Sequence, residues 1–296
     1  MARGYNAEEV KARLISLLSD SKTGLSGVEI SAELGINRVT MTKFLNVFAA
    51  EGIIKQKNIG NLNLWLIEEG TENLKFPDDY FKVQEKYSEF LTQGSESAIY
   101  NLIRNCIGSN ANITKLMTEV IIPSIIQTNS SFDAGRIGKS EQQFLNGIIS
   151  KSIQIINLGH FNQESKKNVI VLSSDAQSIL FAEAASAVFH SDGWNVFSLG
   201  DMSSAIDVLF DLDLKKMLTK IWKSKQEIMI ILVFSSTEEG LKFFSESFDT
   251  IKGKAEKNLF LILSGKVGKK IKIKSDLLSE KLEDIIQWSQ TKFENS

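Results

Sequence analysis

The sequence predicts a multidomain chain: an N-terminal part of three helices and a hairpin, a four-helix bundle, and an α/β part with a doubly wound parallel sheet of the flavodoxin-like type. Its 296 residues leave room for two or three domains that each bury a core. Apolar residues recur every three to four positions over most of the first 157 residues. From residue 166 on, short apolar runs alternate with helical patterns, which is typical of a parallel sheet covered on both faces.

The composition excludes several classes of protein. With 43% apolar and 24% charged residues the chain is an ordinary globular protein, and its net charge of -2 means that any DNA binding must come from a local basic patch. The single cysteine, Cys106, and only two histidines exclude a disulfide framework and a histidine-rich metal site. We therefore expect no metal site and no enzyme. No signal peptide or membrane-length apolar run is visible, so the expected location is the cytoplasm.

The first seventy residues predict helices followed by a hairpin. Ser26 is the expected N-cap of the short second helix, with Glu29 as its capping-box partner, and Asn37 is the expected N-cap of the third. Three helices with a tight second turn and a hairpin make a winged helix-turn-helix, which we assign to residues 1–70. The expected helices cover residues 7–20, 28–34 and 38–50, and the expected strands cover 53–57 and 62–67.

This layout resembles the small bacterial and archaeal regulators of the ArsR and MarR type. The resemblance is carried by residues 30–37, ISAELGIN, and 47–55, VFAAEGIIK. It implies that the third helix enters the major groove of double-stranded DNA. A helix used in that way needs short polar and basic side chains in its first turns, while wing lysines reach phosphates. The candidate DNA-binding residues are Asn37, Arg38, Thr40, Thr42, Lys43, Lys55 and Lys57.

The remaining positions of the third helix are expected to lie in the core. They are Val39, Phe44, Leu45, Val47 and Phe48. One alternative stays open for this domain: a winged helix used only for contact with another protein. It is favoured by the equal numbers of basic and acidic residues in the segment.

After a polar linker over residues 68–79, four helical patterns predict a bundle over residues 79–158. The helices are expected over residues 80–92, 95–107, 113–127 and 139–157. The region resembles the helical cap of cobalamin-binding modules, as in methionine synthase and light-sensing MerR-type repressors. The matching segments are 120–125, VIIPSI; 132–137, FDAGRI; and 140–144, SEQQF.

The resemblance to the cap also implies what each matching position would do. Phe132 stands where photoreceptor members of the family have a Trp over the corrin ring, and Gln142 and Gln143 stand in place of a Glu-His pair.

The C-terminal part, residues 166–292, predicts alternating strands and helices. The strands are expected over 169–173, 194–199, 228–234, 259–263 and 270–274, and the helices over 176–191, 203–222, 238–252 and 276–291. Residues 192–200, DGWNVFSLG, resemble a strand of the cobalamin-binding Rossmann-like domain.

That family carries Asp-x-His-x-x-Gly after its first strand, and the His is the lower ligand of cobalt. Counting back from Trp194 puts Ala176, Ser178 and Phe181 at the three named positions. A serine hydroxyl is a poor cobalt ligand beside an imidazole, so we expect no histidine-ligated cobalamin, and the cofactor stays unknown. The candidate cofactor-binding residues are Phe132, Gln142, Gln143, Ser178, Ser235 and Gly265.

Taken together, the sequence predicts a DNA-binding transcription regulator with a cobalamin-binding-like sensor or oligomerisation module. The expected partners are double-stranded DNA, a second copy of the chain and a small-molecule ligand, but no membrane. Two alternatives stay open: a module that binds no small molecule and acts only in dimerisation or protein docking, and a corrinoid carrier. His160 and His190 are expected to have structural roles.

Overall fold

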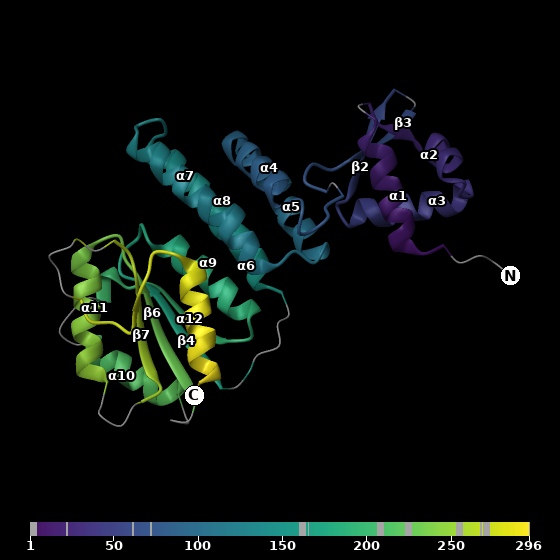
Figure 1. Ribbon diagram of the computed structural model, residues 1–296. Helices are drawn as coiled ribbons and strands as arrows, with labels where there is room; N and C mark the ends of the chain where they lie inside the picture. Colours follow the sequence, from purple (N-terminus) through teal and green to yellow (C-terminus); the bar gives the residue numbers. More distant parts are fainter. Residues whose placement is uncertain are drawn as a thin grey trace. The chain divides into compact units, whose positions relative to one another are not determined.

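The chain divides into two compact units, Met1–Ala111 and Asn112–Ser296, each with its own hydrophobic core (Figure 1). No helix in the described part of the chain has the length and apolarity needed to cross a membrane. The computed structural model describes residues 5–295 except 22, 61, 72, 160–163, 165, 206–209, 223–226, 253–256, 267 and 269–272.

The first unit begins with three helices around a small antiparallel sheet whose strand order is β1-β3-β2. The helices and the β2–β3 hairpin lie within a few residues of the expected ranges, and the two-residue β1 is an addition. These elements are α1 (Ala7–Ser19), β1 (Leu25–Ser26), α2 (Gly27–Leu34), α3 (Arg38–Ala50), β2 (Ile54–Ile59) and β3 (Leu62–Ile67).

Local signals in the sequence account for these helix ends. Ser26 and Glu29 form the expected capping box: the backbone N–H of Ser26 donates to Glu29 Oε2 (2.7 Å), and that of Glu29 donates to Ser26 Oγ (3.3 Å). Gly35 ends α2 with a φ of 64°, a left-handed conformation that favours glycine. The Asn37 side chain caps α3 by accepting from the Val39 N–H.

Helices α4 (Tyr80–Gln93) and α5 (Glu96–Gly108) complete the first unit and pack against each other. The other helices of the expected bundle belong to the second unit: α6 (Ile113–Leu116), the π-helical turn Met117–Ile121, α7 (Ile122–Asp133) and α8 (Lys139–Asn157). The π-helical turn directly precedes Pro123, which lacks an N–H and crowds the carbonyl four residues before it, so the backbone widens there.

The second unit contains the expected doubly wound sheet, with five parallel strands in the order β5-β4-β6-β7-β8. Figure 1 shows α9 and α12 on one face of the sheet and α10 and α11 on the other. The strands are β4 (Lys167–Ser173), β5 (Asn195–Asp201), β6 (Ile228–Phe234), β7 (Leu259–Ser264) and β8 (Leu277–Leu278). The helices are α9 (Ile179–Ser191), the 3-10 turn Ser203–Ala205, α10 (Phe210–Ile221), α11 (Glu238–Ile251) and α12 (Leu282–Glu294).

Three expected elements differ from the structure. The last helix, expected over 276–291, begins only at Leu282, and Leu277–Leu278 within that range form β8. The fifth strand is β8, a few residues after the expected range 270–274, of which 270–272 lie outside the described residues. Asp276 sets its place, because its backbone N–H donates to Leu261 O and its Oδ2 accepts from the Leu261 N–H (both 2.9 Å or shorter). The helix expected over 203–222 begins as a 3-10 turn, and residues 206–209 are outside the described part.

Candidate functional site

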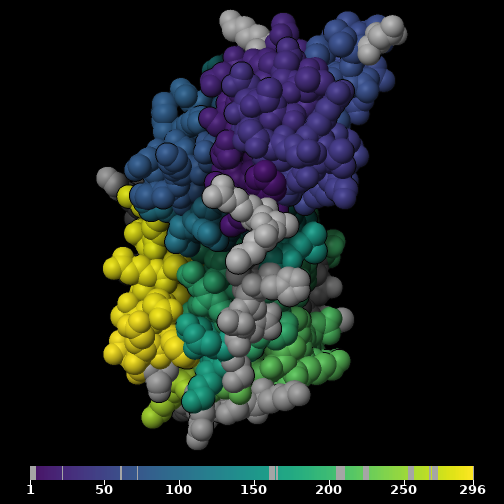
Figure 2. All heavy atoms as spheres, turned by 90° about the vertical axis from the view of Figure 1, so that its right-hand side faces the viewer, coloured from purple at the N-terminus to yellow at the C-terminus, as the bar shows by residue number. Residues whose placement is uncertain are grey.

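Helix α3 has one buried row and one broad exposed face. Met41, Leu45 and Phe48 recur at helical spacing and are buried in the first core. Figure 2 shows the outer face of the first unit, where the purple and indigo atoms of α1, α2 and α3 lie next to one another. The exposed residues of α3 on its opposite side are Arg38, Val39, Thr42, Lys43, Asn46 and Val47.

Both valines of α3 were predicted to lie in the core, and that prediction is wrong. Val39 is 68% exposed and Val47 is 50% exposed. Val39 lies two positions before Met41, and a helix turns about 100° per residue, so the two side chains point to opposite sides. Leu45 and Phe48 are buried as expected, and Phe44 is half-buried.

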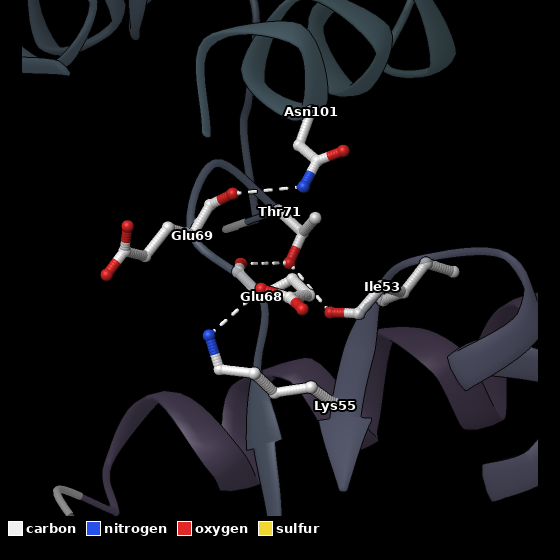
Figure 3. A network of polar contacts seen from close by, with 6 residues as sticks. All are labelled: Ile53, Lys55, Glu68, Glu69, Thr71 and Asn101. Atoms are coloured by element: carbon white, nitrogen blue, oxygen red, sulfur yellow. Dashed lines mark hydrogen bonds and ion pairs between the residues drawn. The ribbon is translucent and has the colours of Figure 1, made fainter. Parts of the chain in front are cut away.

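Three of the four predicted cations are available to an anionic partner. Arg38, Lys43 and Lys57 are exposed and form no ion pair with another described residue. Lys55 differs, because its Nζ lies 3.0 Å from Glu68 Oε2 (Figure 3). The exposed cations without a described ion pair among the predicted residues are therefore Arg38 and Lys43 on α3 and Lys57 on β2.

The predicted polar residues partly serve α3 itself. Asn37 Oδ1 accepts from the Val39 N–H (2.9 Å), and Thr42 Oγ1 donates to the Arg38 carbonyl (2.9 Å). Thr40 is only half-exposed. What remains for a partner is the amide nitrogen of Asn37 as a donor and the Thr42 oxygen as an acceptor.

The turn after the hairpin, residues 68–71, is fixed against α5. Thr71 Oγ1 lies 2.9 Å from Ile53 O and 2.7 Å from Glu68 O, and Asn101 Nδ2 donates to Glu69 O (Figure 3). Gly70 has a φ of 89°, and a Cβ on it would lie 2.3 Å from the Ala98 carbonyl oxygen. The segment expected as the start of a linker is thus a packed turn.

In the second unit, a polar cluster lies at the carboxyl edge of the sheet, where β4 and β6 end. Ser174 Oγ lies 2.6 Å from Ser235 Oγ, and this contact joins the loops that follow the two strands. Asp175 Oδ2 accepts from Ser174 Oγ (3.0 Å) and from the Ser236 N–H (2.8 Å), while Oδ1 accepts from the Ser178 N–H (2.9 Å). Ligands of open α/β sheets bind at this edge.

Asp175 carries a negative charge at this edge. Partial burial raises the pKa of Asp175, but the hydrogen bonds from Ser236, Ser178 and Ser174 outweigh it and hold that pKa below its usual range. Asp175 was not among the predicted site residues. It could have been found from its position two residues after a predicted strand, because polar side chains gather at the carboxyl ends of parallel strands.

A second count of the family pattern can start from Asp175 in the loop after β4. Asp175 is the acid at the start of the loop after β4, and counting from it puts Gln177 at the His position and Leu180 at the Gly position. The count from Trp194 gave Ser178 instead, which is buried and donates its N–H to Asp175. Neither count provides an imidazole at the His position or a glycine at the Gly position, and Leu180 is buried.

The described residues do not fit a histidine-ligated corrinoid. His190 lies eleven residues after the first residue of α9, about 16 Å along the helix axis and away from the carboxyl edge. His160 is outside the described residues. Within the described ranges, no group of three or more His, Cys, Asp or Glu side chains could hold a metal ion.

The candidate cofactor residues fall into two groups. Gln142 Nε2 donates to Asn129 Oδ1 (3.2 Å) and its Oε1 accepts from Lys139 Nζ (3.1 Å), and Lys139 lies 5.2 Å above the Phe132 ring. This first group lies where α7 ends and α8 begins, and Gln143 beside it is exposed.

The second group lies at the carboxyl edge and comprises Ser178, Ser235 and Gly265. A Cβ on Gly265 would lie 2.3 Å from Ser235 O, so the loops after β6 and β7 are in direct contact.

Two hollows of the structure lie away from both groups. One, of about 570 Å³, is lined by Lys167 at the amino end of β4 and by residues of α12 such as Gln287 and Gln290. Another, of about 310 Å³, lies inside the first unit and is lined by residues of α1 and α5, among them Lys11 and Arg104. None of the candidate cofactor residues lines either hollow.

Comparisons with known proteins bear on the fold. No protein-family model matches the chain. No curated protein sequence matches it. The monomethylamine corrinoid protein of Methanosarcina barkeri has a similar structure: the match is 13% identical, covers 73% of this chain and 99% of that chain, and has a TM-score of 0.56. A cobalamin-binding protein of Desulfitobacterium hafniense, 13% identical over 71% of this chain and 98% of that one, reaches a TM-score of only 0.34. The first likeness shows a cobalamin-binding-like Rossmann fold.

Proposed function

We propose that the chain is a transcription regulator whose N-terminal α1–β3 segment is a winged helix-turn-helix that binds double-stranded DNA. The observation that carries the proposal is the exposed face of α3, where Arg38 and Lys43 flank polar side chains and are free of ion pairs with the described residues. A recognition helix places its first turns against base edges, and cations near it neutralise phosphates.

The hairpin supports the same function. Lys57 lies on β2, two residues after Lys55 and therefore on the same side of the strand. Lys57 is available for a phosphate, while Lys55 is held by Glu68. A wing attached to α5 through residues 68–71 would keep Lys57 at a fixed place relative to α3, as register-setting phosphate contacts require.

For the second unit we propose a sensor or oligomerisation module that takes no histidine-ligated corrinoid. The ionised Asp175 and the missing imidazole support this reading. A small-molecule ligand of this edge would have to donate hydrogen bonds or carry positive charge, because the Asp175 carboxylate is there. The alternative is a module that binds no small molecule and only joins two copies or docks a protein.

A second candidate function is a corrinoid carrier. It is favoured by the structural similarity to the monomethylamine corrinoid protein. Adding hydroxocobalamin to the purified full chain tests it: a carrier would form a tight one-to-one complex, whereas the regulator proposed here gives no spectrum of cobalt bound by histidine.

DNA binding is tested by fluorescence anisotropy with the full chain and labelled duplexes enriched from a random pool. Arg38→Ala and Lys43→Ala are expected to weaken binding and each to lower the slope of log K against log salt by about 1. Lys220→Ala, an exposed lysine of α10, is the matched control and should bind as the parent does. Equal affinities for all variants would refute the assignment of α3.

A further inference from the structure

The exposed side of α3 includes an apolar residue that the proposed DNA contacts leave unexplained. Val39 is 68% exposed in the first turn of the helix, directly after Arg38 and four residues before Lys43. Neither helix propensity nor packing accounts for it, since valine is a mediocre helix former and its side chain is outside the core. A polar residue would fit the solvent equally well.

The chemistry of the major groove gives such a side chain a role. Each base pair presents hydrogen-bond donors and acceptors there, and the only apolar group on that edge is the C5-methyl of thymine. The first turns of a recognition helix lie against the base edges, so an aliphatic side chain there can contact this methyl group. Arg38 and Lys43 on either side would hold the helix in place through phosphates or guanines.

We propose that Val39 contacts the C5-methyl group of a thymine, so that α3 prefers an A·T pair at that position of its site. The inference rests on the proposed DNA binding and adds a base preference to it. Val47 provides the comparison within the same helix: it is also exposed, but it lies eight residues further along, about 80° around the helix and about 12 Å along its axis from Val39. It belongs to the half of α3 beyond the base-reading turns.

The experiment uses the full chain and the duplex that it enriches most strongly from a random pool. Each thymine of that duplex is replaced in turn by deoxyuridine, which removes only the C5-methyl group. Affinities are measured by anisotropy for the parent, Val39→Ala and Val47→Ala at one salt concentration. Loss of one buried methyl contact corresponds to a change of about fourfold in affinity.

We expect one thymine at which the replacement weakens binding by about fourfold in the parent and in Val47→Ala but has no effect in Val39→Ala. If Val39→Ala loses as much as the parent at that thymine, or if no thymine methyl affects the parent, the assignment of Val39 is overturned while DNA binding stands. If no duplex is enriched and none binds in a salt-dependent way, the proposed function fails and this inference fails with it. Circular dichroism of both variants checks that they are folded.

Discussion

Replacing Gly70 with alanine should displace the turn at residues 68–71 from α5. The added Cβ would lie 2.3 Å from the Ala98 carbonyl oxygen and 2.7 Å from the Leu102 nitrogen, and both atoms belong to the α5 backbone. The positive φ of 89° adds strain for any residue with a Cβ. The left-handed conformation costs about 1–2 kcal/mol and the overpacking about 1–3 kcal/mol, so Gly70→Ala should destabilise the first unit by about 2–5 kcal/mol.

Gly52→Ala is the matched control for this prediction. Gly52 also has a positive φ, 73°, but a Cβ there meets no atom within 4 Å. It therefore carries the strain without the close approach. Guanidinium unfolding of the full chain gives the midpoints, and hydrogen exchange of peptides from β2 and α5 locates the change. Equal midpoints for the two variants would refute the claim that the turn packs directly on α5.

Four other measurements test the remaining proposals. Lys57→Ala should weaken binding to duplex DNA more than Lys55→Ala does, because Lys55 already pairs with Glu68; anisotropy at several salt concentrations would show the reverse if the hairpin is misassigned. The pKa of the Asp175 carboxyl is lower in the folded chain than in the unfolded chain. The ionised carboxylate therefore stabilises the fold at pH values above its pKa in the unfolded chain, and this stabilisation is lost as pH falls through its lower pKa in the folded chain. Asp175→Asn should therefore lower the urea midpoint at pH 7, and the difference from the parent should become smaller as pH falls. A dimer is expected by light scattering without DNA, and a monomer at tens of micromolar would contradict it. Finally, His190→Ala should not change the spectrum of the protein with hydroxocobalamin, and a change would mean that this imidazole reaches cobalt.

The periodic parts of the fold were predictable because their signals are local. Buried strands such as Ile228–Phe234 are apolar throughout, and the capping box of Ser26 marks its helix start within four residues. The alternation of such strands with helices fixes a parallel sheet through the handedness and length of the connections. The doubly wound parallel sheet of the second unit followed from these patterns, and the resemblance of residues 192–200 pointed to the cobalamin-binding-like fold.

The candidate sites were less predictable because they depend on single positions. Counting from Trp194 crosses a loop and a 13-residue helix, and neither length is fixed by an apolar pattern, so Ser178 and Gln177 both stay candidates for the His position of the family pattern. The sequence alone predicts that Val39 lies in the core, because valine is apolar and nothing in the sequence distinguishes an exposed valine from a buried one. The contact of Gly70 with α5 joins segments about thirty residues apart, and no local pattern reports it.

The packed turn also determines how short an independently folding N-terminal fragment can be. A fragment that ends after β3 would lack Thr71, whose hydroxyl contacts Ile53 O, and the α5 amides that contact residues 69 and 70. The natural end of an independently folding piece therefore lies after α5, near residue 111, and a fragment cut at residue 67 should be less stable than one cut there.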